Sequence, residues 1–198
     1  MRTDTFKLVI ALGLVVAGIF GMMSGGAIER EPGVLAPDAP LQFPIEAARI
    51  AAGDFELQPQ ARYEIEARVL SVERYRTDGG ARLSPIDFAV GWGPMSDSAV
   101  LAHFRVTQGG RFFTIYPDEQ AIDLQTALVS AANMHLIPAT SDVKDMLLRV
   151  RPGHIVHLRG FLVNASRPDG YHWNTSLTRT DSGAGACELF YVEYVGRR

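Results

Sequence analysis

Cysteine is almost absent from this chain of 198 residues, in which Cys187 is the only one. A single cysteine cannot form an internal disulfide, so an apolar core must hold the fold together. The chain also lacks a Walker-type glycine loop, the GxGxxG and GxSxG motifs, and the HExxH and CxxC patterns. These absences argue against a nucleotide-binding domain, an α/β-hydrolase and a zinc site, and the sequence predicts neither a cofactor nor a metal.

Lysine is scarce as well, and the charge balance is slightly acidic. The formal net charge is −3, and lysine occurs only at Lys7 and Lys144. Proteins that bind nucleic acid usually carry a basic surface interleaved with aromatic residues. Nucleic acid is therefore not an expected partner.

One long uncharged run occupies residues 8–28. About 20 apolar residues span a hydrocarbon core of about 30 Å, so the run predicts a transmembrane anchor. Arg2 and Lys7 precede it, which by the positive-inside rule places residues 1–7 in the cytoplasm. A cleaved signal peptide is the alternative, although the run is longer than an ordinary signal-peptide core. The sequence thus predicts a single-pass protein of the bacterial inner membrane, with its C-terminal domain in the periplasm and the membrane contacted through the N-terminal helix.

Residues 29–44 contain four prolines and no periodic pattern. Such a composition is typical of an extended, semi-rigid linker that holds a domain away from the membrane. The exported globular domain is then expected over residues 45–198, beginning with a short helix at 45–52 that ends at Gly53.

The exported domain is predicted to be rich in strands. In residues 61–75, Tyr63, Ile65, Ala67 and Val69 alternate with charged residues, as in a half-buried strand.

Further strands are expected on both sides of a central helical region. Residues 99–117 predict a hairpin turning at Gly109 and Gly110. Three later strands are expected over 154–163, 171–179 and 187–195, with a turn at 167–170 between the first two.

Two helices are expected between these strands. Leu124, Leu128, Ala131 and His135 share one helical face, and Pro138 is the expected stop. Ser141 is expected to cap a second helix over 142–150. The resulting fold class is mainly β with one or two helices (α+β), either a small OB-like barrel or an antiparallel sheet covered by a helix.

Three segments are richer in polar and special residues than loops of their length require, namely 84–98, 130–139 and 172–189. With these segments the chain resembles a group of membrane-anchored bacterial envelope proteins to which no activity is assigned. The resemblance covers most of the exported domain. It implies that the chain is a natural unit and implies nothing about mechanism.

Cys187, in the third segment, is the first candidate for catalysis because it follows a glycine-rich stretch suited to an oxyanion. A nucleophilic thiol needs a neighbouring base, and His135, near the end of its expected helix, is the candidate. Asp181 or Arg179 would assist. The alternative is that Cys187 is a small buried residue and His135 a hydrogen-bonded core residue.

Four residues of the first two segments are candidate ligand-binding residues. Trp92, with glycines on both sides, is either a stacking aromatic or a loop plug in the core. Asp87 and Asp97 are either members of a carboxylate cluster or residues of turns and caps. Asn133, in the second segment, is the fourth candidate ligand-binding residue.

With no strong catalytic motif, the sequence favours a membrane-tethered periplasmic binding or scaffold domain in an envelope assembly, with a protein partner or a small ligand. Two alternatives stay open. One is an envelope hydrolase or thiol enzyme that uses Cys187 with His135. The other is an OB-like binder of oligosaccharide or polyanion. Its binding residues would be the polar side chains of two strands, His157, Arg159, His172, Asn174 and Ser176.

Overall fold

The computed structural model describes residues 26–179 and 186–198. Strands dominate it, which confirms the prediction of a mainly β (α+β) domain, although the described residues hold three α-helices where one or two were predicted. The strands are β1 (Leu41–Pro44), β2 (Ile50–Ala52), β3 (Phe55–Arg74), β4 (Ile86–Gly91), β5 (Phe104–Gly109), β6 (Phe112–Pro117), β7 (Ala131–Pro138), β8 (Ile155–Ser166), β9 (His172–Trp173) and β10 (Glu188–Arg197). The helices are the 3-10 turn η1 (Gly93–Ser96) and the α-helices α2 (Ser98–Leu101), α3 (Leu124–Val129) and α4 (Ser141–Leu148).

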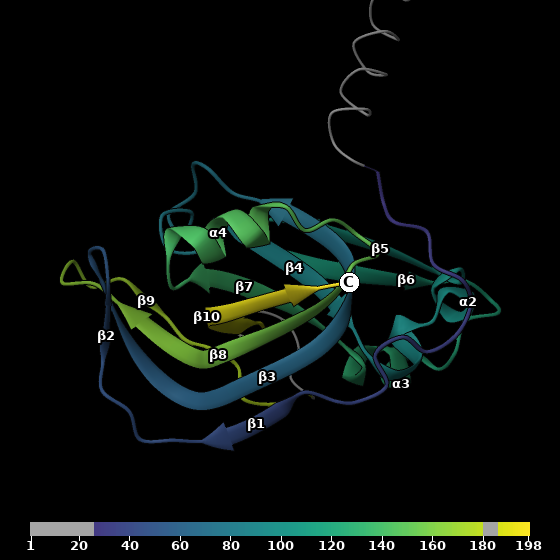
Figure 1. Ribbon diagram of the computed structural model, residues 1–198, viewed down its shortest axis with the longest axis horizontal. Helices are drawn as coiled ribbons and strands as arrows, with labels where there is room; N and C mark the ends of the chain where they lie inside the picture. The colour runs from purple at the N-terminus through teal and green to yellow at the C-terminus, as the bar shows by residue number, and fades with distance from the viewer. Residues whose placement is uncertain (1–25, 180–185) are drawn as a thin grey trace, which may run out of the picture.

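Five strands pair in a closed ring (Figure 1). The long strand β3 pairs antiparallel with β8 through its first part and with β4 through its last part. β4 pairs antiparallel with β7, β7 runs parallel to β10, and β10 returns antiparallel to β8. Each of these strands therefore has one face inside the ring and one outside.

The inner faces form the main core. The alternation predicted for residues 61–75 is confirmed, because Tyr63, Ile65, Ala67 and Val69 are all buried in it. Side chains of successive residues point to opposite faces of a strand, so the residues between them face outward.

A sharp irregularity between β8 and β10 lets the ring close. The pairing register shifts between Val192 and Tyr194, and Gly160 lies opposite this shift. A Cβ atom at position 160 would overlap the carbonyl oxygen of Tyr191, so only glycine allows the two backbones to approach this closely.

The prediction of a helix that continues to His135 is wrong in its second half. α3 ends at Val129 and β7 begins at Ala131, so His135 lies in the middle of a strand. Residues 131–137 are buried on both faces of the sheet. A strand of this kind shows no alternation of apolar and polar residues, and its apolar run resembles a helix of the same length.

Three smaller predictions also need correction. Residues 50–52 form β2 rather than the end of a helix, and Gly53, with φ +64°, turns the chain into β3. Within 171–179 only β9 is a strand. The cap of α4 is Thr140, whose side-chain oxygen accepts a hydrogen bond from the backbone N–H of Val143, rather than Ser141.

Residues 29–44, predicted to be a linker that holds the domain away from the membrane, lie against the domain; they contain bends and end in β1. The guanidinium of Arg30 donates hydrogen bonds to the carbonyl oxygens of Gly153 and Arg198. Ala36 is fully buried, and β1 pairs with β3. The segment is thus part of the folded surface.

The predicted anchor at residues 8–28 falls almost wholly outside the described residues. In the part of the chain that is described, no helix has the length and apolar character needed to cross a membrane.

Candidate functional site

Residues from each of the three polar segments lie together on the outer face of β4, β7 and β10. Asp87 pairs with His135 across β4 and β7, and His135 pairs with Leu189 across β7 and β10. The side chains of Asp87 and His135 both point away from the main core, because their neighbours Phe88 and Leu136 point into it. Strand register therefore brings together residues that lie far apart in the sequence.

Asp87 is the centre of the site. Its carboxylate is fully buried. One oxygen, Oδ2, lies 2.8 Å from Nδ1 of His135, and the other, Oδ1, accepts hydrogen bonds from Arg111 at 2.8 Å and from the Ser84 hydroxyl at 3.3 Å. A buried carboxylate is stable only when charged or polar partners occupy its oxygens, and here both are occupied.

Arg111 covers this carboxylate from the tip of the β5–β6 hairpin. The turn consists of Gly110 and Arg111, one residue later than predicted, and both have positive φ, at +58° and +72°. Positive φ at both central residues is the geometry of a type I′ hairpin turn, which is unfavourable for an arginine backbone. In the described part of the chain Arg111 is the one non-glycine residue with this conformation.

The contacts of the Arg111 side chain offset that cost. Its guanidinium makes two hydrogen bonds to Asp78, of 3.0 and 2.9 Å, and one of 2.9 Å to the carbonyl oxygen of Ser84, besides its bond to Asp87. Its Cζ atom lies 3.6 Å from the centroid of the Tyr75 ring. Arg111, Asp78 and Tyr75 were not predicted from the sequence, since nothing in a turn sequence shows which side chain folds back.

Cys187 and Asn133 lie beside this network. The sulfur of Cys187 is 3.6 Å from Nδ2 of Asn133 and 3.8 Å from the carbonyl oxygen of Arg111. Asn133 is held in place because its Oδ1 accepts a 2.7 Å hydrogen bond from Gln108. Cys187 is partly exposed, so the alternative interpretation of a small buried residue does not describe it.

A cleft of about 530 Å³ opens over these residues, and its walls include Arg111, Phe112, His135, Tyr171, Trp173 and Cys187. The ring of Trp173 lies 4.7 Å from that of His135, centroid to centroid. The same indole packs directly against Gly80, because a Cβ atom at position 80 would lie 2.7 Å from a carbon atom of the Trp173 ring. The cleft therefore has an aromatic wall, a buried imidazole and a thiol.

Arg179 and Glu188 lie on the other side of Cys187, around a smaller cavity of about 300 Å³. Arg179 pairs with the buried Glu188 at 3.0 Å, and its Cζ lies 5.8 Å from the centroid of the Trp92 ring. Arg179 is thus near the thiol but belongs to a separate ion pair.

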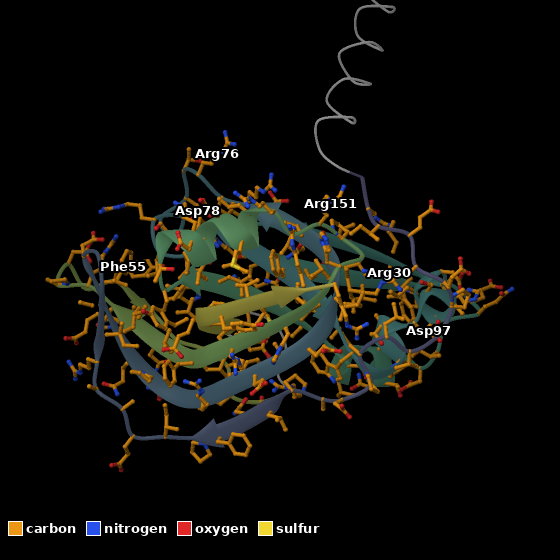
Figure 2. All side chains as sticks on the ribbon, viewed as in Figure 1. Arg30, Phe55, Arg76, Asp78, Asp97 and Arg151 are labelled. Carbon is orange, nitrogen blue, oxygen red and sulfur yellow. The ribbon has the colours of Figure 1, made fainter. Side chains whose placement is uncertain are left out.

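Two predicted ligand-binding residues do not line the cleft. Trp92 is 4% exposed and packs in the main core, as the loop-plug interpretation expects. Asp97 caps α2 and accepts a 2.8 Å hydrogen bond from the backbone N–H of Gly33, so it is a capping residue. Figure 2 shows Asp97 and Asp78 toward opposite ends of the domain. The predicted catalytic residue Asp181 lies outside the described residues.

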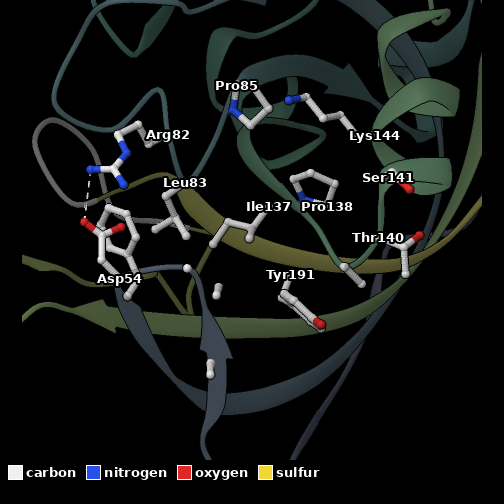
Figure 3. Close-up of a pocket in the computed structure, with 15 residues that line it drawn as sticks. Asp54, Arg82, Leu83, Pro85, Ile137, Pro138, Thr140, Ser141, Lys144 and Tyr191 are labelled. Carbon is white, nitrogen blue, oxygen red and sulfur yellow. Dashed lines mark ion pairs between the residues drawn. The ribbon is translucent and has the colours of Figure 1, made fainter.

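A third cavity, of about 440 Å³, lies between β2 and the start of α4 (Figure 3). Its charged residues are Asp54 and Arg82, which pair with each other at 3.1 Å, and Lys144, which is exposed. No buried polar group of the kind found in the cleft lines this cavity among the described residues, so the cleft is the better candidate site.

The Asp78–Arg111 pair predicts a loss of stability in acid. The hydrogen bond from Arg111 lowers the pKa of Asp78 below its ordinary value of 3.8. A carboxylate with a lowered pKa stabilises the native state at pH values above the ordinary pKa, and this contribution disappears as the pH falls through the lowered one. We expect Asp78→Asn to lower the Tm near pH 7 and to lose most of this effect near pH 2, as measured by circular dichroism. A Tm difference that stays constant over this range would contradict the assignment.

Among residues 26–179 and 186–198, no three His, Cys, Asp or Glu side chains are grouped as metal ligands would be. Comparisons of the chain with protein-family models, with curated proteins and with solved structures give no match.

Proposed function

We propose that this chain is a membrane-tethered periplasmic binding domain with an OB-like barrel, and that the cleft beside Trp173 holds its ligand. The ring of β3, β4, β7, β8 and β10, with α4 between the third and fourth strands, supports the barrel assignment. OB-folds are five-stranded Greek-key barrels that bind oligosaccharides or oligonucleotides on their second and third strands.

The position of the cleft is the observation that carries this proposal. His135 of β7, the third strand of the ring, lines the cleft, and it pairs with Asp87 of β4, the second strand. Its walls come from the connection between the first two strands, which contains Gly80, and from the connection between the last two, which contains Trp173. These are the two loops that flank the ligand in OB-folds.

The chemistry of the cleft favours a neutral sugar over a polyanion. Arg111 is the cation of the cleft wall, and its guanidinium is already bound by Asp78 and Asp87. The remaining walls offer aromatic faces, from Trp173 and Tyr171, and neutral polar groups. Sugars stack on aromatic faces and form hydrogen bonds at their edges, so we propose an oligosaccharide as the ligand.

Titration of the detergent-purified full chain with neutral oligosaccharides of N-acetylated and plain hexoses tests this proposal. We expect saturable binding, detected by calorimetry, and a loss of about tenfold or more in affinity for Trp173→Ala. The matched control is Tyr194→Ala, which removes an aromatic side chain that is 43% exposed on a strand pairing with β8 and does not line the cleft. Equal affinity of the two variants, or no binding by the wild type, would refute the oligosaccharide assignment.

A further inference from the structure

A group of arginine side chains gathers around residues 148–154, which form the end of α4 and its connection to β8. We call this group the arginine surface, and its members are Arg30, Arg74, Arg149, Arg151 and Arg197. Arg30, Arg74 and Arg197 come from distant parts of the chain. Their guanidinium groups donate hydrogen bonds to carbonyl oxygens of residues 148–154, namely those of Gly153, Leu148 and Arg149.

Acidic side chains do not neutralise this surface. Arg149 and Arg151 are exposed. The acids nearest to the surface in the sequence are Glu29, Glu31, Glu73 and Asp145. Within residues 26–179 and 186–198, none of these acids forms an ion pair with the surface. Because the whole chain has a formal net charge of −3, overall composition does not account for this local excess of positive charge.

The imidazole of His154 lies among these arginines. Burial lowers the pKa of His154 below its ordinary value of 6.5, and the positive charges of Arg197, Arg151 and Arg30 lower it further. Guanidinium groups from three parts of the chain therefore act on one ring. Since arginine stays protonated at every physiological pH, the positive charge of the surface is permanent.

The arginine surface lies where the predicted anchor ends. Ile28 is the last residue of the uncharged run, and its backbone N–H donates a 2.8 Å hydrogen bond to the carbonyl oxygen of Pro152. A Cβ atom at Gly153 would overlap the carbonyl oxygen of Ile28, so the two backbones pack closely. Figure 2 shows Arg30 and Arg151 near the point at which the described chain begins. A membrane entered by the uncharged run would therefore lie beside these guanidinium groups.

We propose that the arginine surface binds the anionic head groups of phospholipids in the membrane that holds the anchor, and so fixes the orientation of the domain on that membrane. The proposal rests on the proposed function for the membrane tether only. The oligosaccharide cleft has no part in it, because no member of the arginine surface lines the cleft.

The chemistry of arginine and the position of the surface favour this occupant. A guanidinium is planar and binds a phosphate through two parallel hydrogen bonds. Each basic residue near an anionic lipid surface strengthens the attraction about fivefold. An acidic protein would match the charge equally well, but an uncharged run long enough to span a bilayer ends directly beside the surface, which favours lipid.

The first experiment measures the modification of individual arginines by phenylglyoxal, read by peptide mass spectrometry, in the full chain reconstituted into vesicles. Vesicles of phosphatidylcholine are compared with vesicles in which phosphatidylglycerol replaces one third of the lipid. We expect Arg149, Arg151 and Arg197 to react at least about threefold more slowly in the anionic vesicles. Salt at about 1 M, where the Debye length is about 3 Å, should remove most of this protection. Equal rates in the two kinds of vesicle would overturn the proposal.

The second experiment uses the double variant Arg149→Gln with Arg151→Gln. The side chains of these arginines make no hydrogen bond within the described residues, so the variant should keep the wild-type Tm. We expect Arg197 to lose at least about half of its protection by anionic lipid.

The matched control is Arg49→Gln with Arg82→Gln. It removes the same charge from side chains that are 64% and 71% exposed and that pair with residues of the turn from β2 into β3. Figure 2 shows Phe55, which lies in this region, well apart from Arg151. The control should keep the full protection of Arg197. Equal loss of protection in the two double variants would assign the effect to net charge and reject the surface.

Two further outcomes separate this proposal from others. If the chain stays in the vesicles during flotation but anionic lipid gives no protection, the arginine surface is rejected while the tether and the sugar site stand. If the chain separates from phosphatidylcholine vesicles, the tether is rejected, and protection by added anionic vesicles would still support the surface. Equal protection by inorganic phosphate, added to phosphatidylcholine vesicles, would assign the surface to a free anion and overturn the lipid assignment.

Discussion

Replacing Asp87 with asparagine is expected to lower the free energy of unfolding by about 3–5 kcal/mol, the usual result of removing one partner from a buried ion pair. Asp87 is fully buried, while the side chain of Arg111 is 15% exposed. Asparagine has nearly the same shape but cannot balance the guanidinium, and its amide offers one acceptor where two are needed. Chemical denaturation at neutral pH measures the change, and the slope with denaturant should stay the same.

The matched control is Asp78→Asn, which makes the same chemical change at the other end of the same guanidinium. The Asp78 side chain is 37% exposed, so water can replace its contacts. We expect a loss of at most about 1 kcal/mol. If the two variants were equally stable, Asp87 could not be the electrostatic centre of the site.

Gly160→Ala is expected to lower the free energy of unfolding by about 3 kcal/mol or more. The added methyl group would overlap the carbonyl oxygen of Tyr191 and lie 3.0 Å from its carbonyl carbon. These are backbone atoms, so no rotamer change relieves the contact, and β8 and β10 must separate where their register shifts. Overpacking of this kind usually costs about 1–3 kcal/mol and more when the backbone must move.

Gly79→Ala controls for the general effect of replacing glycine, because no atom lies within 4 Å of the place its methyl group would take. Its stability should stay within about 0.5 kcal/mol of the wild type. Thermal and chemical unfolding of Gly160→Ala and Gly79→Ala measure the two stabilities. Equal stability of the two variants would contradict the close approach of the backbones at Gly160.

Local pattern was enough to predict part of this fold. β3 was predicted because one of its faces is buried, so that Tyr63 and Ile65 alternate with charged residues. β7 was mistaken for a helix because Met134 and His135 are both buried, on opposite faces, and no alternation remains to distinguish the two structures.

The site was predicted in part and for a partly wrong reason. His135 was expected to approach Cys187 from the end of a helix, whereas parallel pairing of β7 with β10 brings the two segments together. Arg111 escaped prediction because its role depends on two carboxylates from other strands and loops, and such contacts leave no mark on a hairpin sequence.

The contacts of Arg30 have a practical consequence for labelling and fusion. Its guanidinium lies 2.7 Å from the carbonyl oxygen of Arg198, and the backbone N–H of Ile28 donates to Pro152 close by. The first described residues and the last residue thus lie side by side, and Figure 2 shows Arg30 well apart from Asp78. A fluorescent protein fused after Arg198 should leave the cleft open to ligand, and a circular permutant that joins residues 198 and 28 should need only a short bridge.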